Sequence, residues 1–131
     1  MKKALFLTLL VSLFFVSACN NGKTQSLEGF YKDGEIENVD KIIIQDGSTG
    51  ATKTITEQEK MDEFLGLIKD IKFSPQKNQE KQNGWRYGIT LFDGEKAFNF
   101  TVNKIGNTYY DTNPDIVPIV DQFYKQLESA E

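Results

Sequence analysis

Three patterns of apolar and polar residues divide the chain. Residues 4–16 form a nearly continuous apolar run in which only Thr8 and Ser12 are polar. Beyond residue 38, short β-branched or alternating stretches predict strands, and apolar residues spaced three and four apart predict helices. The alternation and the helical spacing together predict one folded domain.

The first half of this domain has the pattern of a hairpin followed by a helix. Residues 39–45 are β-branched and predict a strand, and the two glycines of residues 46–50 predict a turn. Residues 51–55 return as the second strand. Thr56 and Glu59 have the spacing of a capping box. The helix predicted after them has an apolar face made of Met61, Phe64, Leu65 and Ile68.

The second half contains further strands and a last helix. Residues 72–73 begin a short strand. Residues 75–84 predict an exposed loop, because no apolar residue follows Pro75 in this segment. Alternation then predicts two strands that meet at the Asp-Gly turn of residues 93–94, and a third strand at residues 108–111. Asp115 can cap the last helix, whose first turn tolerates a proline. Its apolar stripe consists of Ile116, Ile119, Val120, Phe123 and Leu127.

The order β-β-α-(β)-β-β-β-α predicts an α+β fold. Hairpins favour an antiparallel sheet, and two helices with one apolar stripe each favour a single covered face. We therefore expect a two-layer sandwich over residues 38–131, in which two helices lie on one face of a sheet of about five strands. The predicted core is Ile42, Ile44, Phe64, Leu65, Ile68, Trp85, Tyr87, Ile89, Leu91, Phe98, Phe100, Val102, Ile119, Val120 and Phe123.

The N-terminal apolar run has the flanks of a bacterial secretory signal. Two lysines precede it, and small residues end it at Ala18 and Cys19. This segment resembles the lipobox signal of bacterial lipoproteins. The resemblance implies a signal peptide at residues 1–18, cleavage between Ala18 and Cys19, and a diacylglyceryl thioether on Cys19. A transmembrane helix is one alternative, but the run is shorter than the roughly 20 apolar residues that such a helix needs. An ordinary signal peptide is the other alternative.

Residues 19–37 lie between the signal and the predicted domain. They are mostly polar, and we interpret them as the lipidated cysteine and a tether. The alternative is that Phe30 and Tyr31 dock on the domain. The lipid would hold the protein on the extracytoplasmic face of the cell membrane, since two acyl chains suffice for stable anchoring.

Charge and composition exclude several classes of function. The net charge of −4 becomes −6 when Lys2 and Lys3 leave with the signal, and an acidic protein is poorly suited to nucleic acid. The chain has no histidine, and a lipidated Cys19 would leave no thiol for a disulfide, a redox pair or a nucleophile. We expect no metal and no cofactor.

A second resemblance covers most of residues 38–127. Residues 46–50, 84–87 and 91–94 and the pair Tyr109-Tyr110 are similar to segments of small, mostly uncharacterised lipoproteins of low-GC Gram-positive bacteria. These motifs are turns and core aromatic residues. The resemblance therefore implies a fold, and no functional residue other than Cys19.

Catalysis by carboxylates is the enzymatic alternative. A carboxylate-dependent cell-wall hydrolase, or its accessory, would need two acids across one cleft, and the candidates are Asp93, Glu95, Asp111 and Asp115. Each also has an ordinary interpretation as a turn residue, a strand end or a helix cap. Residues 46–50 lack the lysine of a phosphate loop and the ligand set of a calcium loop, so a hairpin turn is the better interpretation.

The sheet face opposite the helices is the candidate binding surface, because arginine and aromatic residues are enriched at binding hot spots. The alternatives are a merely solvated face and docking on the loop of residues 75–84. The function expected is a non-enzymatic binding or inhibitory module with a protein partner. An immunity or exclusion lipoprotein of a mobile element is the alternative. The predicted surface consists of Arg86, Thr90, Phe92, Asn99 and Thr101, with Lys41, Ile43, Gly88 and one of Tyr109 or Tyr110 beside them.

Overall fold

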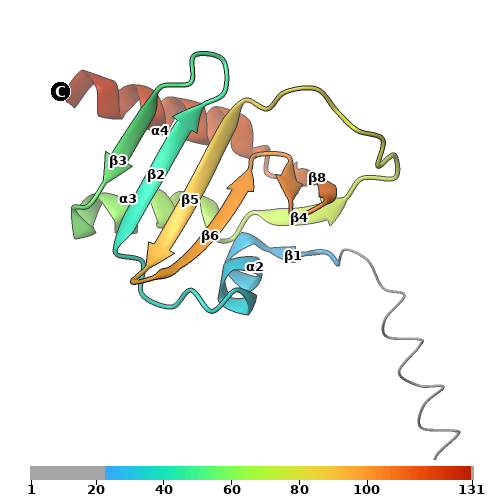
Figure 1. Cartoon of the computed structure of the whole chain (residues 1–131), viewed down its shortest axis with the longest axis horizontal. Coiled ribbons are helices and arrows are strands. Elements are labelled where there is room, and N and C mark those ends of the chain that lie inside the picture. The colour runs from blue at the N-terminus through green and yellow to red at the C-terminus, as the bar shows by residue number, and fades with distance from the viewer. Residues whose placement is uncertain (1–22, 131) are drawn as a thin grey trace, which may run out of the picture.

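The computed structural model describes residues 23–130, with side chains described as far as residue 127. Three helices occur in this range: α2 (Leu27–Asp33), α3 (Gln58–Ile68) and α4 (Ile116–Ala130). Eight strands accompany them (Figure 1): β1 (Gln25–Ser26), β2 (Lys41–Asp46), β3 (Thr52–Ile55), β4 (Lys72–Pro75), β5 (Tyr87–Asp93), β6 (Lys96–Thr101), β7 (Lys104–Ile105) and β8 (Thr108–Asn113). None of the three helices is long and apolar enough to cross a membrane.

The strands form one antiparallel sheet in the order β1-β4-β8-β7-β6-β5-β2-β3. The α+β class and the antiparallel sheet are confirmed. The predicted number of about five strands is wrong, because the described residues form eight, and there is a third helix. Two of the extra elements, β1 and β7, are two residues long, and so short a strand leaves no alternation in the sequence.

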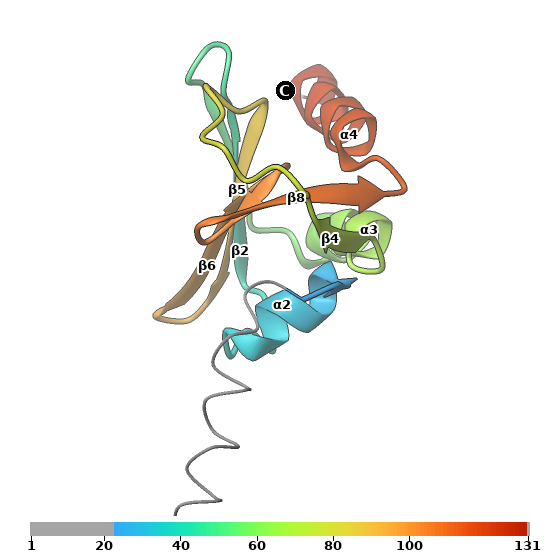
Figure 2. The same cartoon turned by 90° about the vertical axis from the view of Figure 1, so that its right-hand side faces the viewer.

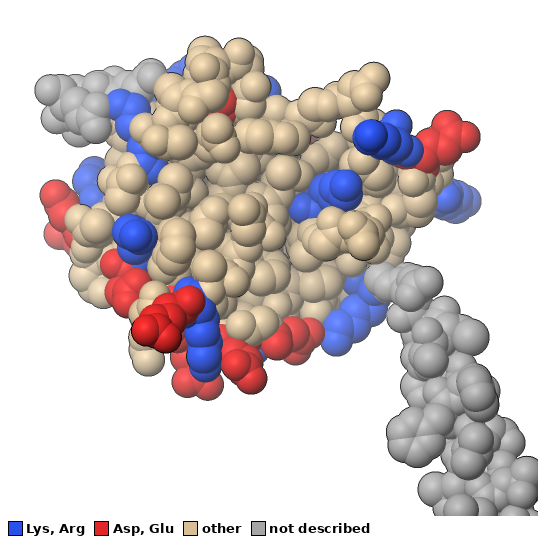
Figure 3. Space-filling model, viewed as in Figure 1, with Lys and Arg blue, Asp and Glu red and all other residues tan. Residues whose placement is uncertain are grey.

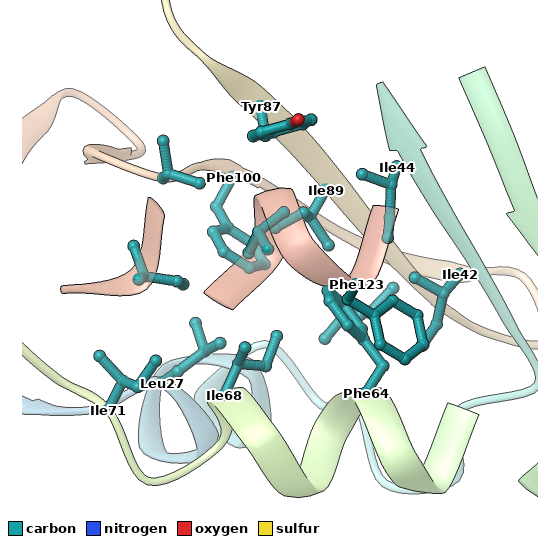
Figure 4. Close-up of a cluster of buried hydrophobic side chains, with 14 of the residues drawn as sticks. Leu27, Ile42, Ile44, Phe64, Ile68, Ile71, Tyr87, Ile89, Phe100 and Phe123 are labelled. Atoms are coloured by element: carbon teal, nitrogen blue, oxygen red, sulfur yellow. The ribbon is translucent and has the colours of Figure 1, made fainter. Parts of the chain in front are cut away.

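Helices α3 and α4 lie on the same side of the sheet, as the apolar stripes predicted (Figure 2). Their side chains meet those of β2 and β5 in the core (Figure 4). Ile42 and Ile44 of β2 are buried with Ile89 of β5, and the rings of Phe64 and Phe123 lie 4.8 Å apart between the two helices. Alternation in the strands and the helical spacing thus converge on one apolar layer.

Most of the predicted core residues are buried. Leu65, Phe98 and Ile119 are half-buried and pack against the core. The prediction for Trp85 is wrong, because 40% of this residue is exposed. Strand β5 begins only at Tyr87, so the alternation that places Tyr87 in the core does not extend back to Trp85.

The segment predicted to be a tether is folded from Gln25 onward, so this prediction is wrong for residues 25–36. Ser26 caps α2, since its Oγ accepts a hydrogen bond from the Gly29 amide at 3.1 Å. Leu27 and Ile36 are fully buried. The alternative, docking of this segment on the domain, is the arrangement observed. A helix of seven residues has too few turns for its apolar stripe to stand out in the sequence.

Phe30 and Tyr31 both contribute to this docking. The Phe30 ring packs edge-on against Phe73 of β4 and Tyr110 of β8, at 6.2 Å and 5.4 Å between ring centroids. Tyr31 is buried, and burial, together with the nearby Glu28 carboxylate, raises its pKa to about 12. The N-terminal segment therefore belongs to the folded unit, which includes the residues from Gln25 onward and does not begin at residue 38.

The two predicted helix caps have different outcomes. Helix α3 begins at Gln58 with Glu57 at the N-cap and no side-chain capping bond, so the capping box of Thr56 and Glu59 is wrong. The helix begins one residue later than the box requires. The Asp115 cap of α4 is confirmed, because its Oδ1 accepts a hydrogen bond from the Val117 amide at 3.1 Å.

Candidate functional site

The centre of the open face of the sheet consists of two rows of residues that lie across the strands. Residues directly opposite each other on neighbouring strands share a face. The pairings of β2 with β3 and β5, and of β5 with β6, therefore define the rows. The rows are Thr54, Ile43, Thr90 and Asn99, followed by Thr52, Gln45, Gly88 and Thr101.

The structure places most of the predicted surface residues together on this face. Thr90, Asn99 and Thr101 lie in the two rows, and Phe92 follows in the next row opposite Lys41. The Lys41 ammonium group lies 4.4 Å from the centre of the Phe92 ring. The face is thus polar at its centre and has a cation–aromatic pair at one end.

Trp85 lies on the open face against two glycines. A Cβ atom at Gly88 would lie 3.4 Å from Cζ3 of the indole ring. At Gly47, in the β2–β3 turn, a Cβ would collide with the Trp85 carbonyl oxygen and approach Cε3 of its ring to 2.7 Å. The Gly47 amide also donates to the carbonyl of Arg86 at 2.8 Å. The backbone of two glycines therefore fixes one side of the Trp85 indole.

Trp85 borders a shallow groove of about 260 Å³ on the open face. Hydroxyl and amide side chains dominate its lining, and none of the lining residues is ionisable. Figure 3 shows the centre of this face with few charged side chains and the acidic and basic residues gathered toward the rim. The lining residues are Ile43, Gln45, Trp85, Gly88, Thr90, Asn99 and Thr101.

Arg86 does not lie on the open face, so its place in the predicted binding surface is wrong. Its guanidinium group lies 3.0 Å from Oδ1 of Asp121 in α4 and 3.5 Å from Oδ1 of Asp46. It also lies over the Tyr87 ring. Alternation predicted Trp85 on the core side and Arg86 on the open face, and the structure shows the reverse. Both residues precede Tyr87, the first residue of β5, so the alternation of the strand does not apply to them.

The Asp121 carboxylate organises the polar contacts behind Arg86. The Tyr87 hydroxyl donates to Asp121 Oδ1 at 2.6 Å, and the Lys125 ammonium lies 3.0 Å from Oδ2. These bonds hold the pKa of Asp121 below its usual range. Burial, followed by the bond to Asp121, raises the pKa of Tyr87. The cluster joins β5 to α4 and is a structural contact between the two layers.

The predicted catalytic acids do not meet in the groove. Asp93 accepts hydrogen bonds from the amides of Glu37 and Asn38 at 2.9 and 3.0 Å, and these bonds lower its pKa. Asp115 caps α4. Asp93, Glu95, Asp111 and Asp115 are all absent from the groove lining. Within residues 23–130, no group of three or more acidic or cysteine side chains could hold a metal ion.

Residues 46–50 form the hairpin turn that the sequence predicted. Asp46 Oδ1 accepts hydrogen bonds from both the amide and the hydroxyl of Ser48, at 2.8 and 2.7 Å. These bonds lower the pKa of Asp46. The aspartate oxygens therefore close the turn between β2 and β3, and this turn brings Gly47 beneath Trp85.

The loop before β5 is exposed, as predicted, and its glutamine side chains bind it to β8. The Gln79 amide exchanges two hydrogen bonds with the Tyr109 backbone, at 2.8 and 2.9 Å. The backbone amide of Gln82 donates to the Tyr109 hydroxyl at 3.0 Å. Tyr109 is therefore the tyrosine on the open-face side, but the loop covers it, whereas Tyr110 packs against Phe73 in the core.

No family model, no curated protein and no solved structure matches this chain. The predicted cleavage site at Ala18 and the lipid attachment site at Cys19 lie outside the described residues. Sequence reasoning missed Trp85 as a surface residue. The two glycines Gly47 and Gly88 were the available signal for this position. Gly47 lies in the β2–β3 turn and Gly88 in β5, and at both places the backbone comes close to the Trp85 side chain.

Proposed function

We propose that this protein is a lipid-anchored binding module that works outside the cytoplasm. The basic start, the short apolar run and Cys19 support the anchor. The observation that carries the binding function is Trp85, a large aromatic residue that is 40% exposed and held on two glycines beside an uncharged groove. Interface centres are depleted of charge and enriched in aromatic residues, and tryptophan is common at hot spots.

The chemistry of the groove favours binding over catalysis. Its side chains offer hydroxyl groups, amides and an indole, and none of these titrates near neutral pH. The histidine that most often acts as a general base does not occur in the sequence. These groups orient a ligand by hydrogen bonds and packing, and they supply no acid or base for bond cleavage.

The lipid anchor gives a direct prediction. In Cys19→Ser cells, we expect loss of palmitate labelling and release of the protein from the membrane fraction, because two acyl chains provide the stable attachment. The measurement is metabolic labelling combined with fractionation. Ser17→Ala is the matched control, since it keeps a small residue before the cleavage site and should leave labelling unchanged. Full membrane sedimentation of Cys19→Ser would contradict the anchor.

Binding through the open face gives a second prediction. The chain that begins at Asn20, which has neither the apolar run nor the lipid to enter a membrane and keeps the whole folded segment, is sedimented with envelopes prepared from the parent bacterium. We expect Trp85→Ala to weaken this binding at least about 30-fold, the loss that follows from a hot-spot contribution of about 2 kcal/mol. Bound and free protein are measured over a range of envelope concentrations.

The matched control is Leu67→Ala. Leu67 is 49% exposed and is the other large apolar residue on the surface of the described chain, but it lies on α3 in the helical layer. We expect Leu67→Ala to bind like the parent protein. Equal binding by both variants would exclude the open face as the binding surface.

A further inference from the structure

We propose that the groove on the open face binds a neutral glycan chain, with Trp85 as the platform on which a sugar ring stacks. This inference rests on the proposed function, because it names the ligand of the same open face. Three properties of the groove support it: the fixed indole, the hydroxyl and amide groups beside it, and the shape and charge of the lining.

The first property is a preorganised aromatic surface. Contact with Gly47 and Gly88 fixes one side of the Trp85 indole, and 40% of the residue is exposed to solvent. The face of an aromatic ring carries negative partial charge and attracts weakly positive groups. The C–H groups on one side of a pyranose ring have this character. Because the indole is already held in place, stacking costs little conformational entropy.

The second property is the supply of unengaged polar groups. Within residues 23–130, the side chains of Thr90 and Asn99 make no hydrogen bond to the protein, and the two residues face each other across β5 and β6. Amide and hydroxyl groups both donate and accept hydrogen bonds. Sugar hydroxyl groups do the same, so this pair matches a glycan without needing an ionised partner.

Two neighbouring side chains are partly engaged and retain binding capacity. The Thr101 hydroxyl donates to Asn103 Oδ1 at 3.0 Å, which leaves its oxygen as an acceptor. The Gln45 amide nitrogen makes a long bond of 3.4 Å to the Gly50 carbonyl, which leaves the amide oxygen as an acceptor. The groove therefore presents the Thr90–Asn99 pair in one row and an acceptor on either side of Gly88 in the next row.

The third property is the shape and charge of the groove. Its volume of about 260 Å³ is below the range of about 300–1,000 Å³ for pockets that enclose a small molecule. It crosses β2, β5 and β6, which at about 4.8 Å between strands span about 10 Å. A chain lying across the strands fits this shape. The lining has no cation to hold an anionic polymer, and the net charge of −4 opposes one.

A peptide is a weaker match for this groove. Extended peptides are commonly bound by adding a strand to an open sheet edge, where backbone groups are free. The groove lies on the face of the sheet, and its central strand β5 is paired with β2 on one side and β6 on the other. A ligand there can reach only side chains, which favours a hydroxyl-rich chain over a peptide backbone.

The test uses Trp85 as its own reporter, because it is the only tryptophan in the chain. The mature lipoprotein is purified in a detergent without a sugar headgroup and titrated with tetra-N-acetylchitotetraose, cellotetraose and maltotetraose. We expect at least one tetrasaccharide to shift the Trp85 emission to shorter wavelength in a saturable way, because stacking removes the indole from water. Heparin and polyglutamate are expected to cause no saturable shift.

Two variants keep the reporter and change the groove. Thr90→Asp and Asn99→Asp should each weaken the saccharide response at least ten-fold, since each places a charge where the ligand is neutral. Thr24→Asp is the matched control, because Thr24 is exposed and precedes β1, at the other end of the sheet order from β2 and β5. Its titration should match that of the wild type.

The outcomes separate this inference from the function on which it rests. A flat emission with all three tetrasaccharides, or an equal saturable shift with an anionic polymer, would overturn the neutral glycan. If envelope binding still depends on Trp85 in that case, the open face binds another ligand and the proposed function stands. If envelope binding does not depend on Trp85 either, both proposals fail.

Discussion

Phe73→Ala is expected to lower the free energy of unfolding by about 3–5 kcal/mol, the usual cost of truncating a buried phenylalanine. Phe73 is fully buried in β4. Its ring contacts Phe30, Phe100 and Tyr110 at 5.9–6.3 Å between centroids. The variant leaves a cavity where α2, β6 and β8 meet. Urea unfolding followed by far-UV circular dichroism measures the loss, which is large beside a typical stability of about 5–15 kcal/mol.

Trp85→Ala is the matched aromatic control for this experiment. Alternation in the sequence predicted that Trp85 lies in the core, but the structure leaves it 40% exposed on the open face. We therefore expect Trp85→Ala to cost only about 1 kcal/mol or less. Losses of equal size in Phe73→Ala and Trp85→Ala would contradict the surface position of Trp85.

Leu27→Ala is expected to lower the free energy of unfolding by about 2–5 kcal/mol. Leu27 begins α2 and is fully buried, and its amide donates to the Ile71 carbonyl at 2.9 Å. In Figure 4 its side chain lies beside Ile68 and Ile71 at one end of the core. Truncation removes this packing and leaves a cavity where α2 meets the end of α3.

Leu67→Ala is the matched leucine control, because it makes the same truncation at an exposed helical position. It should change the stability by no more than about 0.5 kcal/mol. The comparison also tests the N-terminal segment, since a tether over residues 19–37 would make Leu27→Ala as harmless as Leu67→Ala. Chemical unfolding of both variants under the same conditions gives the answer.

The sequence predicted those parts of the fold that have a long regular pattern. Alternation found β5 and β6, β-branched residues found β2, and helical spacing found α3 and α4. The two-residue strands β1 and β7 and the seven-residue helix α2 escaped, because one or two turns of helix or a single strand pair leave no period to detect. The docking of α2 also depends on β4 and β8, which lie about forty and eighty residues further along the chain.

Alternation predicted which strand residues share the open face, but it did not predict the positions of the two residues that precede β5. Thr90, Asn99 and Thr101 occupy the face that alternation assigned to them. Trp85 and Arg86 do not, because the backbone leaves the strand before Tyr87 and Gly84 adopts a φ of +76°. The pairing of Arg86 with Asp121 joins residues 35 positions apart, and charge alone does not identify such partners.

The folded N-terminal segment sets how far the domain can stand from the membrane. Strand β1 begins at Gln25, six residues after the proposed lipid attachment at Cys19. Six residues span at most about 20 Å, however they are arranged. An anchored protein would thus hold its first strand within about 20 Å of the lipid. The groove could then stand no farther from the bilayer than this linker and the width of the domain together, and a polymer confined to the outer part of the envelope would stay beyond its reach.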